Sequence, residues 1–416
     1  MDRTDKPSAP PSGPPSGHAV TFVLLSVLLD MVGFGLIIPV LPNLIEQVGG
    51  FGLSEAAKVG GWMFFAFSAM QFACSPLMGN LSDRFGRRPL LLLAIAGLGL
   101  DYLLQAFAPT LFWLFVGRVI AGFCGSSWVI ANAFIADVTT PENRARYFGL
   151  LGACFGLGFV IGPAIGGLLG EFGPRVPFFV AAAISVLNLI YGYFVLPETL
   201  APENRRKFQW RRANPFGAFA VFRSYAGVLP MCVVLFVFFF CSSIYGAIWA
   251  FWGMAKFGWS PAMVGLTLAI FGVVMASFQG GLAGPGAARF GERKMVLFGL
   301  IFSVIGCLGY GFAPGLAAVV VLMVVHGPEG FVHPMLTAMM TKNVPADAQG
   351  ELQGGISAIM SVAMLAGTVF FAQLFGIAME RGGSFAPDIA FFVGGGGLAL
   401  TLVLFVILIP AEARAR

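Results

Sequence analysis

Long apolar runs limit what this chain can fold into more than any other feature of its sequence. About 20 apolar residues are needed to cross roughly 30 Å of hydrocarbon. Runs of that kind lie near 20–44, 59–79, 89–107, 110–134, 145–169, 175–196, 226–252, 262–283, 294–312, 315–340, 352–378 and 386–409. Lipid offers no partner to backbone polar groups, and the runs lack period-two alternation, so we predict twelve membrane helices rather than a barrel.

Composition agrees with a membrane protein. The 416 residues are 58% hydrophobic and only 10% charged, whereas soluble domains carry roughly 25% charged residues. The fold class we predict is therefore an all-α membrane protein. The six cysteines fall within predicted spans without a C-x-x-C pair, so we interpret them as small apolar packing residues.

The distribution of positive charge predicts the topology. Four basic residues fall on one set of connections: Lys58, Arg175, Lys256 and Arg381. Arg118 lies inside a span, and the other nineteen of the twenty-four Lys and Arg residues fall on the opposite set. Because positive charge resists translocation, both termini and the segment 197–225 are predicted to be cytoplasmic, in a multi-pass protein of the cell (inner) membrane. The basic excess is thus explained by topology, and no nucleic-acid partner is expected.

Two related halves are indicated by the sequence. We predict a disordered cytoplasmic tail at 1–18, a six-helix bundle at 19–196, a central cytoplasmic loop at 197–225, a second bundle at 226–410 and a short tail at 411–416. Three short motifs recur 205 residues later in the chain. Phe85-Gly86 matches Phe290-Gly291, Phe107-Ala108-Pro109 matches Phe312-Ala313-Pro314, and Gly149 matches Gly354. Such duplication is the usual plan of secondary transporters, with the substrate site between the repeats.

A short basic turn joins the second and third spans. It contains Gly79, Asp83, Arg84, Gly86, Arg87 and Arg88. Asp83 can accept hydrogen bonds from backbone N–H groups at a helix N-terminus, where the helix dipole also favours an anion. The arginines can pair with acidic groups or lipid phosphates. A second copy at 284–294 has Ala288 in place of the aspartate, so the two halves are expected to gate unequally.

These motifs resemble those of the major facilitator superfamily, in particular its 12-span drug:proton antiporters and the tetracycline-resistance efflux proteins. The likeness extends over residues 20–378. It rests on the basic turn, on Arg118-x-x-x-Gly122, on Gly158-x-x-x-Gly162-Pro163-x-x-Gly166-Gly167, on Asp30 to Pro42, on Ala136-Asp137-Val138, on Leu196-Pro197-Glu198 and on Gln349 to Gly354. The resemblance implies two six-helix pseudo-repeats in the major facilitator fold. It also implies that Asp83 reaches the start of helix 11, near Gln349–Glu351, and closes the cytoplasmic gate.

The glycines of span 5 are predicted to pack tightly. Gly158, Gly162 and Gly166 share a helix face, Gly167 and Pro163 accompany them, and small residues permit close helix approach. By the resemblance they contact the other half and bias the protein toward export. Ordinary small-x-x-x-small packing is the alternative.

Three charged residues sit inside spans of the first half: Asp30, Asp101 and Arg118. Buried charge is costly in a bilayer and marks function by default. Their depths are comparable, so we predict a network in which one aspartate carries the proton and Arg118 tunes it. The alternative is a permanently ionised structural pair.

Span 10 carries a second polar group. His326, Glu329 and His333 are spaced i, i+3, i+7, which places them on one helix face. The tetracycline efflux proteins carry a histidine in helix 8 and an aspartate in helix 9, at positions that correspond to Met275 and Ser303. We therefore predict that Glu329, with His326 or His333, takes over coupling. A satisfied polar cluster and a metal site are the alternatives.

Together these patterns predict a proton-coupled antiporter that exports a drug-like, possibly tetracycline-type, molecule by alternating access. Tyr245, Trp249, Trp252 and Gln353 are the predicted substrate-binding residues. No phosphate-binding G-x-x-x-x-G-K-[ST] loop occurs, so no cofactor is expected and the proton gradient is the energy source. The expected partners are a small amphipathic substrate, protons and membrane lipid, with the monomer as the functional unit. A small-metabolite transporter and a polytopic membrane metalloenzyme remain alternatives, although catalytic motifs such as H-E-x-x-H are lacking.

Overall fold

The computed structural model describes residues 17–125, 127–206, 208, 225, 227–345 and 348–410. Most of the predicted N-terminal tail, most of the central loop and the tail at 411–416 lie outside these residues. The described residues form helices and connections, with no strand among them. The all-α fold class is thereby confirmed for the described chain.

The first helix begins at Gly17, so it includes the last two residues of the predicted tail. The helices of the first half are α1 (Gly17–Ile37), α2 (Leu41–Gly49), α3 (Leu53–Phe85), α4 (Arg87–Phe107), α5 (Leu111–Cys124), α6 (Ser127–Val138), α7 (Pro141–Gly170) and α8 (Val176–Val195), followed by the 3-10 turn η1 (Pro202–Asn204). The second half contains α10 (Val228–Phe257), α11 (Pro261–Ala276), η4 (Ser277–Leu282), α12 (Ala283–Phe290), α13 (Glu292–Phe312), α14 (Leu316–His326), η5 (Gly327–Phe331), α15 (Val332–Thr341), α16 (Gln349–Arg381) and α17 (Ile389–Leu408).

Eleven helical segments in the described chain are long and apolar enough to cross a membrane. They account for every predicted span except the one at 59–79. That span lies within α3, whose 33 residues exceed the roughly 20 that a crossing needs. The chain is a multi-pass membrane protein, and the count of twelve spans stays a prediction.

Several predicted spans are interrupted. The run at 20–44 ends as α1 at Ile37 and resumes as α2 at Leu41, because Pro39 lacks the N–H group that a continuous helix requires. The run at 315–340 contains the 3-10 segment η5 between α14 and α15. A 3-10 stretch within a longer helix often marks a functional hinge.

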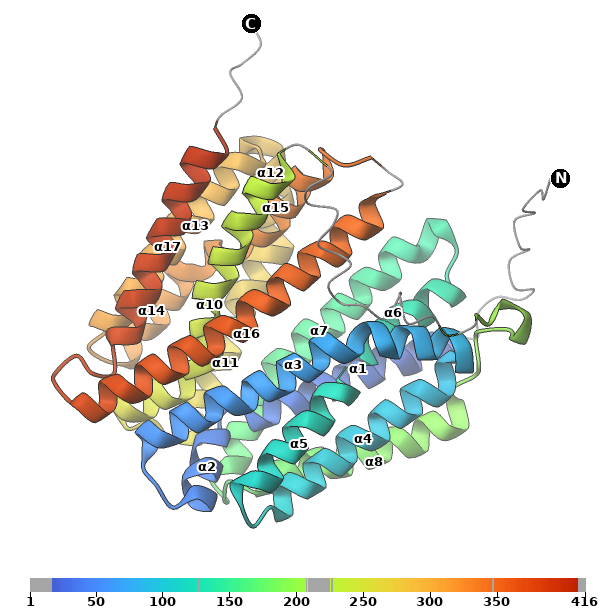
Figure 1. Cartoon of the computed structure of the whole chain (residues 1–416), viewed down its shortest axis with the longest axis horizontal. Coiled ribbons are helices and arrows are strands. Elements are labelled where there is room, and N and C mark those ends of the chain that lie inside the picture. The colour runs from blue at the N-terminus through green and yellow to red at the C-terminus, as the bar shows by residue number, and fades with distance from the viewer. Residues whose placement is uncertain are drawn as a thin grey trace, which may run out of the picture.

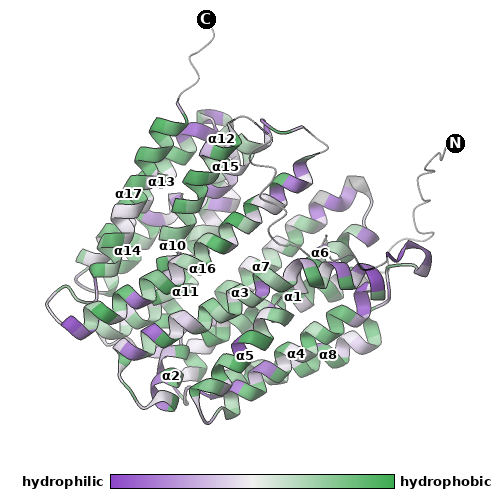
Figure 2. Cartoon of the chain, in the orientation of Figure 1, coloured by the Kyte–Doolittle hydropathy of each residue, from purple (hydrophilic) through white to green (hydrophobic). Residues whose placement is uncertain are grey.

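The helices form two bundles that meet along α3 with α16 and α7 with α11. In Figure 1 α3 and α16 run side by side through the centre of the molecule. Polar residues concentrate at the helix ends and apolar residues cover their middles, as Figure 2 shows. All six cysteines lack a disulfide partner and five are buried, so they occupy packing positions.

The contacts between the halves are concentrated at one end of the molecule. Lys58 near the start of α3 pairs with Glu380 near the end of α16 at 2.5 Å. Gln373 also donates to the backbone oxygen of Lys58 at 3.1 Å. We call this the closed end, and the opposite end, with the turn at 79–88, the basic end.

Candidate functional site

A pocket inside the first bundle gathers the buried charges of that half. Its lining comes from α1, α3, α4, α5 and α6 and includes Asp30, Gln71, Asp101, Tyr102, Arg118 and Ser127. Phe34 and Phe67 add an aromatic wall. The pocket combines apolar surface with a few convergent polar groups, which is the usual make-up of a small-molecule site.

Asp101 and Arg118 form an ion pair between α4 and α5. Arg118 Nη2 donates to Asp101 Oδ2 at 3.0 Å, and Gln105 Nε2 donates to Asp101 Oδ1 at 2.6 Å. Asp101 is fully buried and Arg118 is 3% exposed. Gly117 makes room for the pair, because a methyl group there would lie 2.5 Å from Asp101 Oδ1. Within the described residues, Arg118 Nε has no hydrogen-bond partner.

Asp30 lies beside this pair but does not join it. Its Oδ2 accepts a hydrogen bond from Ser127 at 3.3 Å, and it lines both the main pocket and a smaller neighbouring one. The structure thus brings the three predicted charged residues to one pocket, with only Asp101 and Arg118 in direct contact. The coupling roles of these residues stay predictions.

Sequence reasoning missed Gln71 and Gln105, both of which lie in or beside the pocket. Gln71 Nε2 donates to the backbone oxygen of Gly125 at 3.2 Å, where the chain passes from α5 to α6. Gln105 holds Asp101 in place. The available signal was a long polar side chain inside an apolar span, which demands a hydrogen-bond partner.

In the second half, the structure brings together only two of the three polar residues of span 10. His326 Nε2 contacts Glu329 Oε2, and the Tyr310 hydroxyl lies 3.3 Å from His326 Nδ1. His333 packs edge-on against Phe239 instead. Of the two histidines predicted as partners of Glu329, His326 is therefore the one in contact, and the coupling role of this group stays a prediction. The described residues contain no group of three metal-ligating side chains.

The predicted aromatic substrate wall is a packed cluster in this conformation. Trp249 and Trp252 are 4% and 0% exposed. Trp249 Nε1 donates to Thr267 at 3.0 Å, and Trp252 Nε1 donates to Asp388 at 2.8 Å. Because both indoles are buried and satisfied, neither is open to a substrate here. Tyr245 is half-buried, and its ring lies tilted against that of His326, with ring centroids 4.8 Å apart.

Gln353 of α16 is exposed and remains open to a substrate. Ser303 of α13 is fully buried, and its hydroxyl donates to the backbone oxygen of Gly299 at 2.9 Å. The side chain of Met275 in α11 lies next to Gly330 in η5. The two positions where the resemblance would place charge therefore flank the segment that carries Glu329.

At the basic end, one glycine replaces the predicted turn. The helix α3 continues through Gly79 and Asp83 to Phe85, and α4 begins at Arg87, so only Gly86 separates them. Gly86 has φ +104, and a methyl group there would lie 2.7 Å from the carboxyl carbon of Glu198. The positive φ is a backbone conformation that L side chains rarely adopt, so this position favours glycine.

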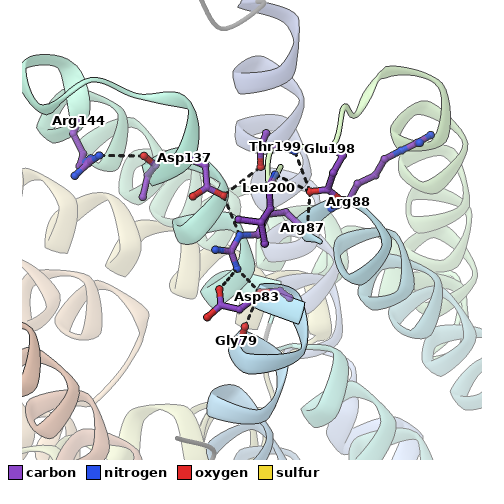
Figure 3. A network of polar contacts seen from close by, with 11 residues as sticks. Gly79, Asp83, Arg87, Arg88, Asp137, Arg144, Glu198, Thr199 and Leu200 are labelled. Carbon is purple, nitrogen blue, oxygen red and sulfur yellow. Dashed lines mark hydrogen bonds and ion pairs between the residues drawn. The ribbon is translucent and has the colours of Figure 1, made fainter. Parts of the chain in front are cut away.

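Arg87 is the centre of a polar network at this end (Figure 3). It donates to Asp137 at 3.0 Å, to Asp83 at 2.6 Å and to Ser82 at 2.7 Å, and it is only 7% exposed. Glu198 accepts from the backbone N–H groups of Arg87 and Arg88 and so caps the N-terminus of α4. This cap suits the helix dipole, which favours an anion at that end.

The expected contact between Asp83 and the start of α16 is not made in this conformation. Across the described chain, the Asp83 carboxylate pairs with Arg87, and no bond joins it to 349–351. The outer arginines stay nearby: Arg84 lies over the Phe85 ring at 4.9 Å, and Arg88 donates to the backbone oxygen of Tyr193 at 2.7 Å. The basic end is therefore without the predicted lock between the halves.

The second copy of the turn has the same backbone but reversed charges. Gly291, with φ +79, separates α12 from α13 as Gly86 separates α3 from α4. At the offset of 205 residues, Arg87 corresponds to Glu292 and Asp137 to Lys342. Lys342 donates to Glu292 at 2.5 Å, so each repeat keeps an ion pair at this place with its signs exchanged. The Lys342 side chain is 63% exposed, in contrast to Arg87.

The span-5 glycines pack mainly within their own half. Methyl groups on Gly158 and Gly162 would lie 2.6 Å from Met31 Cβ and 2.7 Å from the Val32 oxygen, both on α1. Gly166 likewise faces Leu36. The prediction of a contact with the other half is wrong for these three, because their helix face points at α1. Gly167 and Pro163 do face α11, next to Gly265.

Substitution Gly162→Ala is expected to separate α7 from α1, because the added methyl group meets backbone atoms that cannot rotate away. Overpacking of this kind costs about 1–3 kcal/mol. The thermal midpoint of the purified protein should fall, and Gly156→Ala on the same helix is the matched control. Gly156 has open space around its Cβ position, so alanine there should gain roughly 0.5–1 kcal/mol. Equal effects of the two substitutions would contradict this packing.

Glu171, just beyond α7, joins the halves at the closed end. Its carboxylate accepts from the backbone N–H group of Ala262 in the first turn of α11 at 3.0 Å. Hydrogen bonds from Ser260 and Ala262 hold the pKa of Glu171 below its ordinary value. A negative charge from the first half thus caps a helix of the second half.

Comparisons with known proteins were made with this geometry in hand. The family model of the Major Facilitator Superfamily matches residues 23–251 and 231–416. The chain is 35% identical to tetracycline resistance protein, class C, of Escherichia coli, over 95% of this chain and 97% of that protein. It is 28% identical to multidrug resistance protein 2 of Bacillus subtilis (strain 168), over 92% of this chain and 94% of that protein. Among solved structures, the human organic anion transporter MFSD10 (TETRAN) has a TM-score of 0.69 at 24% identity, over 94% of this chain and 100% of that chain.

Two helical bundles with paired motifs and buried charges define a polytopic secondary transporter. The chain belongs to the Major Facilitator Superfamily. Within that family it resembles drug:proton antiporters of the tetracycline-resistance type, and the solved neighbours, which include the nucleoside transporter NupG (TM-score 0.76, 12% identity, 95% of this chain and 100% of that chain), share its fold. The metabolite-transporter and metalloenzyme alternatives are not favoured by these relatives.

Proposed function

We propose that this protein exports a tetracycline-type drug in exchange for protons. The observation that carries the proposal is the buried Asp101–Arg118 pair beside Asp30 in a partly aromatic pocket. Relatives named as tetracycline resistance proteins, 32–35% identical over most of the chain, support the substrate class. Those relatives are transporters, so we infer that this chain is not an enzyme.

The pair offers a direct means of coupling. The deprotonated Asp101 carboxylate offers a negative charge and hydrogen-bond acceptors to the donors or cationic groups of a substrate. A proton on Asp101 removes that charge, and the substrate is released. Proton and drug thus compete for the same carboxylate, and this competition is what exchange requires. The proton gradient is the only energy source in this scheme, and no cofactor takes part.

We place the basic end at the cytoplasm of the inner membrane, because most Lys and Arg residues lie on that side of the spans. Both termini then face the cytoplasm. The closed end, with Lys58–Glu380 and Glu171, then faces outward, and the pocket takes its drug from the cytoplasmic side. Each bundle holds its own buried charges, so a monomer suffices for transport.

The decisive experiment is a drug-susceptibility panel in an efflux-deficient bacterial host. Cells that express the protein should need a severalfold higher concentration of tetracycline for inhibition than cells with an empty vector. Everted membrane vesicles should take up tetracycline when energised, and a protonophore should stop the uptake. Chloramphenicol, a fluoroquinolone and a cationic dye test the width of the substrate range. Absence of protection against every drug would refute the proposal and favour a metabolite substrate.

A further inference from the structure

The buried pair His326–Glu329 is not used by the mechanism proposed above. His326 is fully buried at the end of α14, and Glu329 is 6% exposed in η5. The pair joins His326 Nε2 to Glu329 Oε2, and Tyr310 lies at the other ring nitrogen. Within the part of the chain that the structure describes, no Lys or Arg pairs with Glu329.

The groups around this pair are neutral or apolar. From α13 come Tyr310 and Cys307, and from α10 come Tyr245 and Cys241. The helix α11 contributes the Phe271 ring, with its centroid 5.5 Å from that of His326. The His326 imidazole is therefore the group of the pair that can carry a positive charge and neutralise the Glu329 carboxylate.

This arrangement fixes how many protons the pair holds at rest. With one shared proton, the pair is neutral overall, either as imidazolium and carboxylate or as imidazole and carboxylic acid. Without it, a lone carboxylate remains in an apolar surrounding, and burying an unpaired charge is costly. The pair therefore retains the proton while it is closed off and gives it up only when water or a cation reaches Glu329.

The Tyr310 hydroxyl suits both protonation states. It can donate to Nδ1 when that nitrogen is bare, and it can accept from Nδ1 when that nitrogen carries a proton. When the pair loses one proton to water from Nδ1, Nε2 keeps its hydrogen toward the Glu329 carboxylate and the Tyr310 hydroxyl rotates to donate to the bare Nδ1. No other bond changes.

The position of the pair favours a moving rather than a purely structural role. The segment η5 lies between α11 and α13. On the α13 side a methyl group on Gly299 would lie 2.8 Å from the Pro328 oxygen, and one on Gly306 would lie 2.8 Å from His326 Cβ. On the α11 side Met275 meets Gly330. A 3-10 break in mid-span, held by glycine contacts, is a natural hinge.

We propose that His326 and Glu329 form a second proton-binding site, which holds one exchangeable proton in the second half of the transporter. Its use in transport rests on the proposed function, whereas the existence of the site does not. Each half then carries one buried acid–base pair: Asp101–Arg118 joins spans 3 and 4, and Glu329–His326 lies within span 10. Each cycle of drug–proton exchange would then involve one proton at each of the two pairs.

The first test measures proton release. Purified full-length protein in weak buffer with a pH indicator receives tetracycline, and the protons released per protein are counted. Glu329→Gln should release about one proton fewer than wild type. The matched control is Glu55→Gln, which removes an exposed carboxylate at the start of α3 and should match wild type. Release by Glu329→Gln equal to wild type would overturn the proposal. No release by wild type would count against the proposed function instead.

The second test does not depend on a substrate. The chain has only three histidines, so His18→Gln with His333→Gln leaves His326 as the single imidazole for nitrogen NMR. In a pH titration its Nε2 signal should differ between the protein with Glu329 and the added Glu329→Gln variant, because the carboxylate contacts Nε2. Identical titrations would overturn the site, whatever the transport result. Size-exclusion elution of each variant shows that it has folded.

Discussion

The substitution Asp101→Asn is expected to abolish energised tetracycline uptake into everted vesicles. Asparagine keeps the size of the side chain but cannot carry the proton. It also leaves the guanidinium of Arg118 buried without its anion. Removing one partner of a buried pair costs about 3–5 kcal/mol, so lower protein yield accompanies the loss of transport.

The double substitution Asp101→Asn with Arg118→Gln separates these two effects. Asparagine and glutamine leave no unpaired charge in the bundle, and an unpaired buried charge is the costly element of the single variant, so yield and thermal midpoint should recover. Transport should stay absent because no titratable group has returned. If the double variant takes up tetracycline as wild type does, the pair is a permanently ionised structural element. That result would return the coupling role to Asp30 or to the second half.

The substitution Arg87→Ala is expected to destabilise the basic end. It removes the cation that pairs with both Asp83 and Asp137 in the described part of the chain and leaves these carboxylates close together without it. Because Arg87 is mostly buried but the remaining carboxylates are 35% and 24% exposed, the loss should lie between the roughly 0–1 kcal/mol of exposed pairs and the about 3–5 kcal/mol of buried ones. The measurement is the thermal midpoint of the purified protein, together with the yield of folded protein.

The second repeat offers a matched control in Lys342→Ala. Lys342 pairs with Glu292 at the equivalent position, yet its side chain is 63% exposed. Exposed pairs contribute roughly 0–1 kcal/mol, so this variant should stay close to wild type. A loss as large as that of Arg87→Ala would mean that burial does not decide the strength of these pairs.

Much of the fold could be predicted because it depends on properties of short stretches of sequence. Lipid demands helices of about 20 apolar residues, and eleven of the twelve predicted runs coincide with helices that meet this demand. The 205-residue offset pointed to duplication, and Gly86 and Gly291 occupy matching single-residue breaks. The charges in apolar spans could also be found, because a charged residue among apolar ones needs no structure to be noticed.

The neighbours of those residues could not be found in the same way. A glycine face at i, i+4 spacing predicts close packing but not the helix that is approached, and Gly162 meets α1 rather than the other half. Nothing in the sequence distinguishes Trp249 and Trp252 from tryptophans that face a substrate. In the structure their indoles are buried and donate hydrogen bonds to Thr267 and Asp388. Partner choice depends on the relative rotation of helices, which no single span encodes.

The sequence by itself determined the membrane class, the helical architecture, the doubled plan and the candidate residues Asp30, Asp101, Arg118 and Glu329. These conclusions depend on hydrophobicity and on the presence of charged residues within apolar spans, which are properties of short segments. Only the tertiary structure decided that Asp101 pairs with Arg118, that Glu329 pairs with His326 and not His333, and that Arg87 joins Asp83 to Asp137. Pairings of this kind arise between helices, where distance and burial set the strength of every charge.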